Sequence, residues 1–115
     1  MKEESQRQKK INRQIQRDLG EMLQQNGSAI QPGVMFTVTQ VRVTADLSIA
    51  RVYLSVFPSE QPELIVQKVN DQARELRYKL GKRVRHQLRV VPELHFYLDD
   101  SLDYIDNIEE KLDND

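Results

Sequence analysis

The chain has 115 residues, the length of one domain, and contains no cysteine, which excludes disulfide scaffolds, thiol nucleophiles and cysteine zinc sites. No run approaches the roughly 20 apolar residues that cross a bilayer, and residues 1–5 lack the apolar core of a signal peptide. We therefore expect a soluble, cytoplasmic protein with no membrane partner.

The formal net charge of −1 conceals a segregation of charge along the chain. Residues 99–115 hold eight acids and one base, a net charge of −7 that leaves +6 on the preceding 98 residues. Within those, residues 74–89 carry seven bases and one acid. A basic body with an acidic tail is typical of a protein that binds a polyanion.

Apolar residues at helical spacing predict an amphipathic helix near the N-terminus. Ser5 and Gln8 have the spacing of a capping box, which opens the helix, and Asn26-Gly27 ends it. Its apolar stripe consists of Ile11, Ile15, Leu19, Met22 and Leu23. The turn-forming residues that follow, over 26–33, predict a loop.

Two strands are predicted after this loop. Residues 34–44 are rich in Val, Thr and Phe, but their apolar alternation changes phase at Thr39-Gln40. The phase change indicates either a β-bulge or a strand that crosses between two packed surfaces. Residues 50–56 alternate apolar and polar side chains, and the short connection 45–48 makes the two strands a hairpin.

A second helical region and a third strand complete the predicted elements. The apolar residues of the helical region step by three or four: Ile65, Val69, Ala73, Leu76, Leu80, Val84 and Leu88. They predict either one long helix or two helices broken near Gly81, ended by Pro92. Residues 94–98 alternate as a strand, and residues 99–101 cap a short helical pattern that extends to 112.

This order, α-β-β-α(α)-β, predicts an α+β fold in which helices cover one face of a three-stranded sheet. If the middle region is a pair of helices, we expect the third strand to lie parallel to the first and antiparallel to the second. We assign residues 1–100 to one domain. Residues 101–115 form an acidic C-terminal tail, predicted to be a short helix or disordered.

Signals for catalysis are weak. His86 and His95 lie nine positions apart across a predicted helix–strand boundary, and no nucleophile elbow or glycine-rich phosphate loop is present. We predict surface or interface roles for both histidines, no enzymatic activity and no cofactor. The acids between 99 and 103 superficially resemble a metal loop but lack the glycine and closing glutamate of a calcium-binding hand. We interpret them as an acidic helix start.

The bases of residues 74–89 are the most informative feature. An ordinary solvated face is the alternative, but few acids accompany them and arginine outnumbers lysine five to two. The arginine fork suits phosphate oxygens, so we predict contact with nucleic acid, supported by two arginines of the hairpin. The predicted RNA-binding residues are Arg42, Arg51, Arg74, Arg77, Lys79, Lys82, Arg83, Arg85 and Arg89.

Other residues are weaker candidates for the same surface. The N-terminal bases have the acids Glu3 and Glu4 nearby; they are Arg7, Lys9, Lys10 and Arg13. Tyr53, Tyr78 and His95 are candidates for stacking on bases, although each could equally pack against the protein.

The element order resembles a type II KH domain, although the chain has no GxxG loop. Residues 36–47, 50–55, 76–82 and 88–96 are similar to segments of the bacterial ribosome-binding factor A family, as is Asp99-Asp100-Ser101. The resemblance spans about residues 5–105. That family usually has an Ala-x-Gly kink between the middle helices, where this chain has Gln72-Ala73-Arg74. We therefore expect a kink moved to Gly81 or a straighter helix.

The resemblance implies a KH-like RNA-binding domain with a non-enzymatic role in late assembly of the small ribosomal subunit. The implied partner is 16S rRNA within pre-30S particles, with support for 5′-end processing, no small-molecule substrate and a monomer off the ribosome. The residues alone leave two other hypotheses open. One is a protein-interaction module whose basic face binds an acidic protein, and the other is a metal-dependent hydrolase that uses the acidic tail.

Overall fold

The computed structural model of the chain describes residues 4–99. Its first helix, α1 (Gln6–Asn26), begins at the predicted capping box. The Gln8 N–H donates to the Ser5 hydroxyl at 3.1 Å, and the Ser5 N–H donates to the Gln8 side chain at 2.8 Å. All five residues of the predicted apolar stripe are buried. A 3-10 turn, η1 (Gly27–Ala29), follows the helix and lies within the segment predicted as a loop, residues 26–33.

Strands β1 (Met35–Val43) and β2 (Ile49–Phe57) form the predicted antiparallel hairpin. Their register shifts between Val38 and Gln40, so the β-bulge is confirmed. Because the bulge adds one residue, Val38 before it and Val41 after it are both buried although they lie three positions apart. The same shift turns Arg42 to the exposed face of the sheet.

The middle helical region is two helices, α2 (Pro62–Asp71) and α3 (Ala73–Val84), broken at Gln72. Both expectations, a break near Gly81 and a straighter helix, are wrong. Gln72 has φ −99° and ψ 8°, a conformation that needs no glycine. Its N–H donates to the Val69 carbonyl and its carbonyl accepts from the Leu76 N–H, both at 2.9 Å, so one residue ends α2 and begins α3.

Strand β3 (Glu93–Leu98) lies beside β2 and runs parallel to it. The expected direction is therefore wrong, because β3 is antiparallel to β1. The physical reason is that α2 and α3 together form one crossover connection, which returns the chain to the end of the sheet where β2 begins. The register confirms this, since Ile49 pairs with Glu93 and Leu54 pairs with Leu98.

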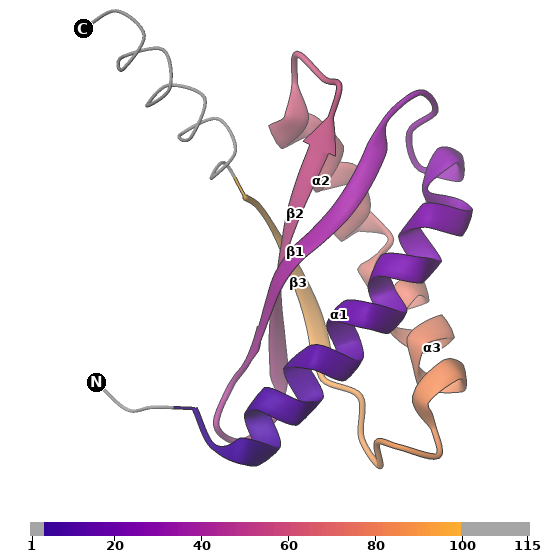
Figure 1. Cartoon of the computed structure of the whole chain (residues 1–115). Helices are drawn as coiled ribbons and strands as arrows, with labels where there is room; N and C mark the ends of the chain where they lie inside the picture. Colours follow the sequence, from indigo (N-terminus) through magenta and orange to yellow (C-terminus); the bar gives the residue numbers. More distant parts are fainter. Residues whose placement is uncertain (1–3, 100–115) are drawn as a thin grey trace, which may run out of the picture.

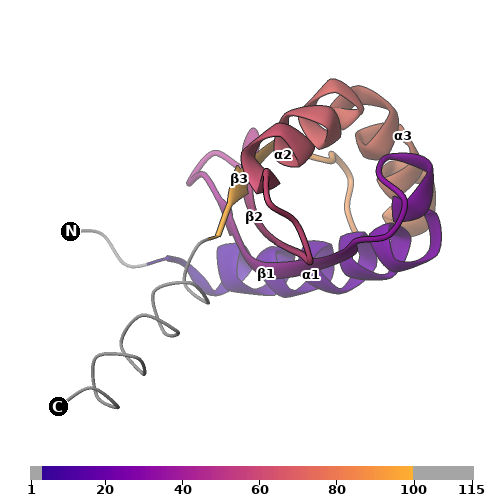
Figure 2. The ribbon, with the colours of Figure 1, turned by 90° about the horizontal axis from the view of Figure 1, so that it is seen from above.

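The three helices cover one face of the sheet (Figure 1, Figure 2). Between the two layers lies one apolar core, to which every strand contributes, with Phe36, Leu54 and Phe96 among its largest members. No helix covers the opposite, outer face of the sheet within residues 4–99. None of the helices in that range is long and apolar enough to span a membrane.

Amide side chains from the helices satisfy backbone groups on both outer edges of the sheet. Asn70 of α2 accepts from the Phe96 N–H and donates to the Phe96 carbonyl, both at 2.9 Å. On the other edge, Asn12 accepts from the Val43 N–H at 2.8 Å, and Gln8 donates to the Val43 carbonyl at 3.1 Å. Because these backbone groups are already paired, a further strand could not pair with the sheet at Val43 or Phe96 without displacing the amides.

Candidate nucleic-acid interface

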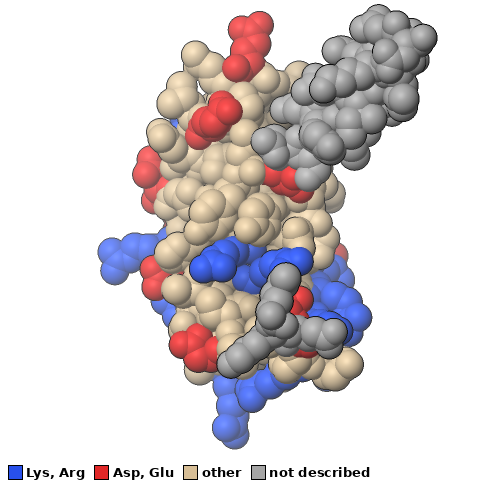
Figure 3. Space-filling view, turned by 90° about the vertical axis from the view of Figure 1, so that its left-hand side faces the viewer, with Lys and Arg blue, Asp and Glu red and all other residues tan. Residues whose placement is uncertain are grey.

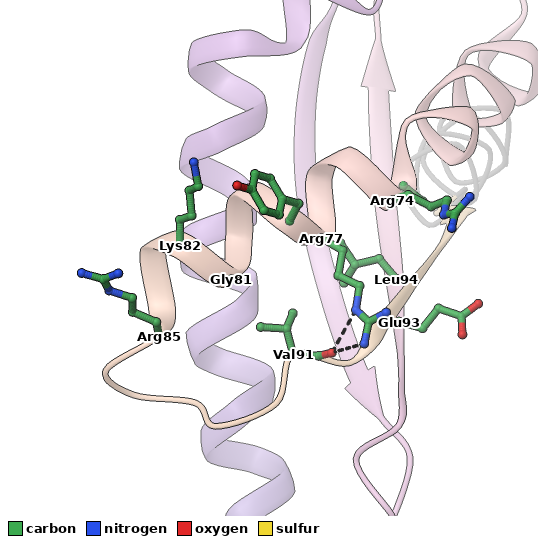
Figure 4. Close-up of a pocket in the computed structure, with 10 residues that line it drawn as sticks. Arg74, Arg77, Gly81, Lys82, Arg85, Val91, Glu93 and Leu94 are labelled. Carbon is green, nitrogen blue, oxygen red and sulfur yellow. Dashed lines mark hydrogen bonds between the residues drawn. The ribbon is translucent and has the colours of Figure 1, made fainter.

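A groove of about 780 Å³ runs between α3 and the segment that leads into β3 (Figure 4). It gathers four of the seven bases predicted between residues 74 and 89. Its lining consists of Ala73, Arg74, Arg77, Tyr78, Gly81, Lys82, Arg85, Val91, Glu93 and Leu94. Glu93 is the one acid among these residues, so the lining carries an excess of positive charge.

Helical periodicity explains why these bases share a groove. Arg74, Arg77 and Arg85 recur at the spacing of one side of α3, while Leu76, Leu80 and Val84 on another side are buried. The apolar contacts orient the helix, and this orientation presents the bases to solvent. We call this surface the α3 groove.

Two residues of the α3 groove are held by contacts within the protein. Arg77 donates from Nε and Nη2 to the carbonyl of Val91, at 3.0 and 2.8 Å, and so attaches α3 to the segment before β3 (Figure 4). The Lys82 Nζ lies 4.7 Å from the centre of the Tyr78 ring, a cation–π contact that leaves the ammonium accessible.

Three groove bases, including Lys82 despite its contact with Tyr78, keep their charge available to a ligand. Arg74, Lys82 and Arg85 are exposed and form no ion pair with any residue from 4 to 99. Three cations without an ion pair in the described range surround the apolar Ala73, Val91 and Leu94, an arrangement that suits an anionic ligand such as a phosphate chain.

Two other predicted bases lie on a different side of α3, toward α1. Arg83 forms ion pairs with Asp18 and Glu21 of α1, and the distance from its Nε to Asp18 Oδ1 is 3.3 Å. Lys79 pairs with Glu75 at 3.5 Å. The predicted bases therefore do not form one continuous cationic flank.

Arg89 lies beyond the end of α3 in a third location. It lines a cavity of about 830 Å³ together with Arg7 and Lys10 of α1 and with His86. The structure thus places two of the four N-terminal bases, Arg7 and Lys10, in the same cavity as Arg89 rather than in the α3 groove.

Arg42 and Arg51 lie on the outer face of the sheet, not at an edge beside the helices. They are directly opposite each other in the register of β1 and β2. Tyr53 lies on the same face, stacked on Tyr97 with ring centres 5.5 Å apart. Sequence reasoning did not select Tyr97, although its alternation with Phe96 places it on the exposed face of β3.

The two histidines occupy surface positions, as predicted. His95 is partly exposed, with its Nε2 3.2 Å from Glu93 Oε1, and His86 is exposed. No group of three His, Asp or Glu side chains between residues 4 and 99 could hold a metal ion. The predicted acidic helix and tail, from residue 100 onward, lie outside the described residues and stay predictions.

Together the fold and the α3 groove define a class: α+β proteins of the KH-like type II arrangement, with a cationic helix surface and without a GxxG loop. A family model described as "Ribosome-binding factor A" matches residues 7–112. The chain belongs to the ribosome-binding factor A family.

Relatives from this family are similar in sequence to this protein along most of the chain. Ribosome-binding factor A of Christiangramia forsetii is 44% identical over 111 residues, covering 96% of this chain and 85% of the relative. That of Flavobacterium psychrophilum is 46% identical over 112 residues, covering 95% and 85%.

Two of the structural neighbours are from Thermus thermophilus. The crystal structure of its ribosome-binding factor A is 27% identical with a TM-score of 0.65, covering 79% of this chain and 94% of that one. A homology model of that protein, fitted into a cryo-EM map of its complex with the 30S subunit, is 27% identical with a TM-score of 0.58, covering 76% of this chain and 93% of that one.

Proposed function

We propose that this protein binds the small ribosomal subunit during late assembly, and that the α3 groove holds 16S rRNA. The observation that carries the proposal is the cluster of unpaired cations in the groove: Arg74, Lys82 and Arg85. The Thermus thermophilus neighbour fitted into a 30S complex supports the choice of partner. RNA is the partner whose backbone supplies a regular row of negative charges for such a groove.

Binding of this kind acts on a conformational equilibrium of the RNA and needs no chemistry. The protein favours the state of the pre-30S particle for which its affinity is higher, and it dissociates when the mature state no longer fits the groove. In this way it supports 16S rRNA maturation, including processing of the 5′ end by other factors. We propose that it does so in the cytoplasm, as a monomer off the ribosome, without a cofactor.

The test is a charge reversal in the groove, Arg74→Glu with Arg85→Glu, compared with Lys68→Glu on α2. All three residues are exposed, but Lys68 is not part of the groove lining. We expect the double variant to bind rRNA fragments and 30S particles at least tenfold more weakly. The slope of the logarithm of the binding constant against the logarithm of the salt concentration should also become shallower, by about 0.7–0.9 for each lost phosphate contact.

Unchanged rRNA affinity in the double variant would overturn the proposal. The protein-interaction hypothesis would instead be supported if neither the wild type nor the double variant bound rRNA, and if the double variant lost binding to an acidic protein that the wild type binds. Sedimentation of a lysate tests the assembly stage, since we expect the protein with 30S particles and little of it with 70S ribosomes.

A further inference from the structure

We propose that the outer face of the sheet is a second RNA-binding surface, which takes a single-stranded segment and stacks its bases on Tyr53 and Tyr97. The chemistry of the ligand rests on the proposed function. The surface itself is separate from the α3 groove, because it lies on the side of the sheet that faces away from the helices (Figure 2).

The register of the three strands arranges this surface in two neighbouring rows. One row holds Arg42, Arg51 and His95, which occupy paired positions on β1, β2 and β3. The next row holds Gln40, Tyr53 and Tyr97, also at paired positions. Side chains two residues apart on a strand are about 7 Å apart, so the basic row and the aromatic row are within reach of one nucleotide.

The charges on this face favour the binding of an anionic ligand. Arg42 and Arg51 face each other directly across two strands, an arrangement of like charges that destabilises a sheet unless something offsets it. Neither forms an ion pair with any residue between 4 and 99. The neighbour of Arg42 is neutral: the Gln40 amide, turned with its oxygen toward the guanidinium, accepts from it at 2.8 and 3.2 Å.

Two acids near this face are already engaged. Glu93 contacts His95, and the carboxylate of Asp99 accepts from the Thr39 hydroxyl at the bulge. Figure 3 shows Lys and Arg side chains across the middle of this face, with acidic side chains around them and a wider area of uncharged residues above. A phosphate between the two arginines offsets their mutual repulsion.

The tyrosine pair provides a surface on which bases can stack, which phosphate contacts alone do not provide. The rings stack on each other with an angle of 29° between their planes, and Tyr97 is 41% exposed. Neither ring belongs to the apolar core, so their stacking is not needed to fill it. A base added to this pair continues an existing stack. In a duplex the bases already stack on each other, so the surface selects single strands.

The test compares two ligands that bind the full chain: an oligoadenylate of eight nucleotides and an abasic strand with the same number of phosphates. We expect Tyr97→Ala to weaken oligoadenylate binding five- to tenfold and leave abasic binding unchanged. Tyr97→Phe retains the ring and binds like the wild type. Arg42→Gln with Arg51→Gln weakens binding of both strands and lowers the salt slope by about 1.4, for two single-strand phosphates.

Ring protons of Tyr53 and Tyr97 give a readout that does not depend on affinity. We expect their NMR signals to move upfield with oligoadenylate and to stay in place with the abasic strand. Wild-type affinity in Tyr97→Ala with no ring shift, or ring shifts caused only by an acidic peptide, would overturn the inference.

The groove variant separates this inference from the proposed function. If Arg74→Glu with Arg85→Glu loses rRNA binding while the sheet variants do not, the outer-face site is wrong and the groove stands. If the sheet variants lose single-strand binding while the groove variant binds rRNA normally, the outer face stands and the α3 groove is not the rRNA site.

Discussion

Arg83 of α3 forms an ion pair with Asp18 of α1, a carboxylate whose side chain is only 10% exposed. Gln14, one turn earlier in α1, also donates to this carboxylate. Asp18 therefore connects α1 to α3 through Arg83 and binds the preceding turn of α1 through Gln14. The pair explains why one of the seven bases of residues 74–89 is turned away from the α3 groove.

We expect Arg83→Ala to lower the free energy of unfolding by about 1–2 kcal/mol, because it leaves a largely buried carboxylate with only the exposed Arg17, at 3.9 Å, as a cationic partner. Lys79→Ala is the matched control, since its pair with Glu75 is exposed and is worth about 0.3–0.5 kcal/mol. Urea denaturation measures both. Equal losses in the free energy of unfolding would show that the ion pair between α1 and α3 stabilises the protein no more than the exposed pair does.

Gly27 lies where the chain leaves α1 and passes close to the buried ring of Phe36. A Cβ at residue 27 would lie 2.6 Å from Phe36 Cδ2, although φ is −62°, so the obstacle is steric rather than conformational. We expect Gly27→Ala to destabilise the protein by about 1–3 kcal/mol.

Gly20 is the matched control for this substitution. It lies inside α1 with nothing within 4 Å of an added Cβ, so we expect Gly20→Ala to stabilise the protein by about 0.5–1 kcal/mol. Thermal unfolding followed by circular dichroism measures both variants. The explanation fails if the two substitutions change the melting temperature in the same direction.

Asp46, in the turn between β1 and β2, has a perturbed pKa. Its Oδ1 accepts from the Thr44 hydroxyl at 2.7 Å and from the Ser48 hydroxyl and N–H at 2.7 and 3.1 Å. These hydrogen bonds, that from Thr44 first, lower the pKa of Asp46 from 3.8 to about 2.

A pKa that is lower in the folded state gives a stabilisation that is complete above about pH 4 and is lost as the pH falls toward 2. We expect Asp46→Asn to be less stable than the wild type at neutral pH, with the difference shrinking across that range. Asp71→Asn, an exposed acid on α2, is the control. A carbon-13 NMR titration that places the Asp46 pKa near 3.8 would contradict the interpretation.

Glu93 is the one acid in the lining of the α3 groove, so it opposes phosphate binding there. We expect Glu93→Gln to raise the affinity for rRNA two- to fivefold at low salt, with the gain disappearing at high salt because the interaction is screened. Glu63→Gln on α2 makes the same charge change away from the groove and serves as the control. Equal effects of the two substitutions on rRNA affinity would count against binding in the groove.

Local patterns were sufficient to predict α1, the three strands and a helical region after residue 62, because the spacing of apolar side chains follows the burial pattern of each element. They offered the bulge at Thr39-Gln40 as one of two alternatives. The helical region was predicted to end at Pro92, whereas α3 ends at Val84. The break at Gln72 was not predictable, because it uses an ordinary φ and depends on how α2 and α3 pack on the sheet. The direction of β3 also depends on that crossover. No local pattern reports either feature.

The division of the bases into separate surfaces was only partly predictable. Residues 74 and 83 lie nine positions apart, which places them on opposite sides of a helix, so helical phase alone could have separated Arg83 from the groove. The residues of α1 that face Arg83 could not be foreseen, because Asp18 and Glu21 are brought there by tertiary packing.

The amide contacts of Asn70, Asn12 and Gln8 with the rims of the sheet have a consequence for how the domain meets other extended chains. A short sheet with free rims is a template on which an extended segment can add a further strand. At Val43 and Phe96 the outward backbone groups are already paired with side chains of the domain's own helices. An extended segment would have to displace these amides before it could pair with the sheet at those two positions.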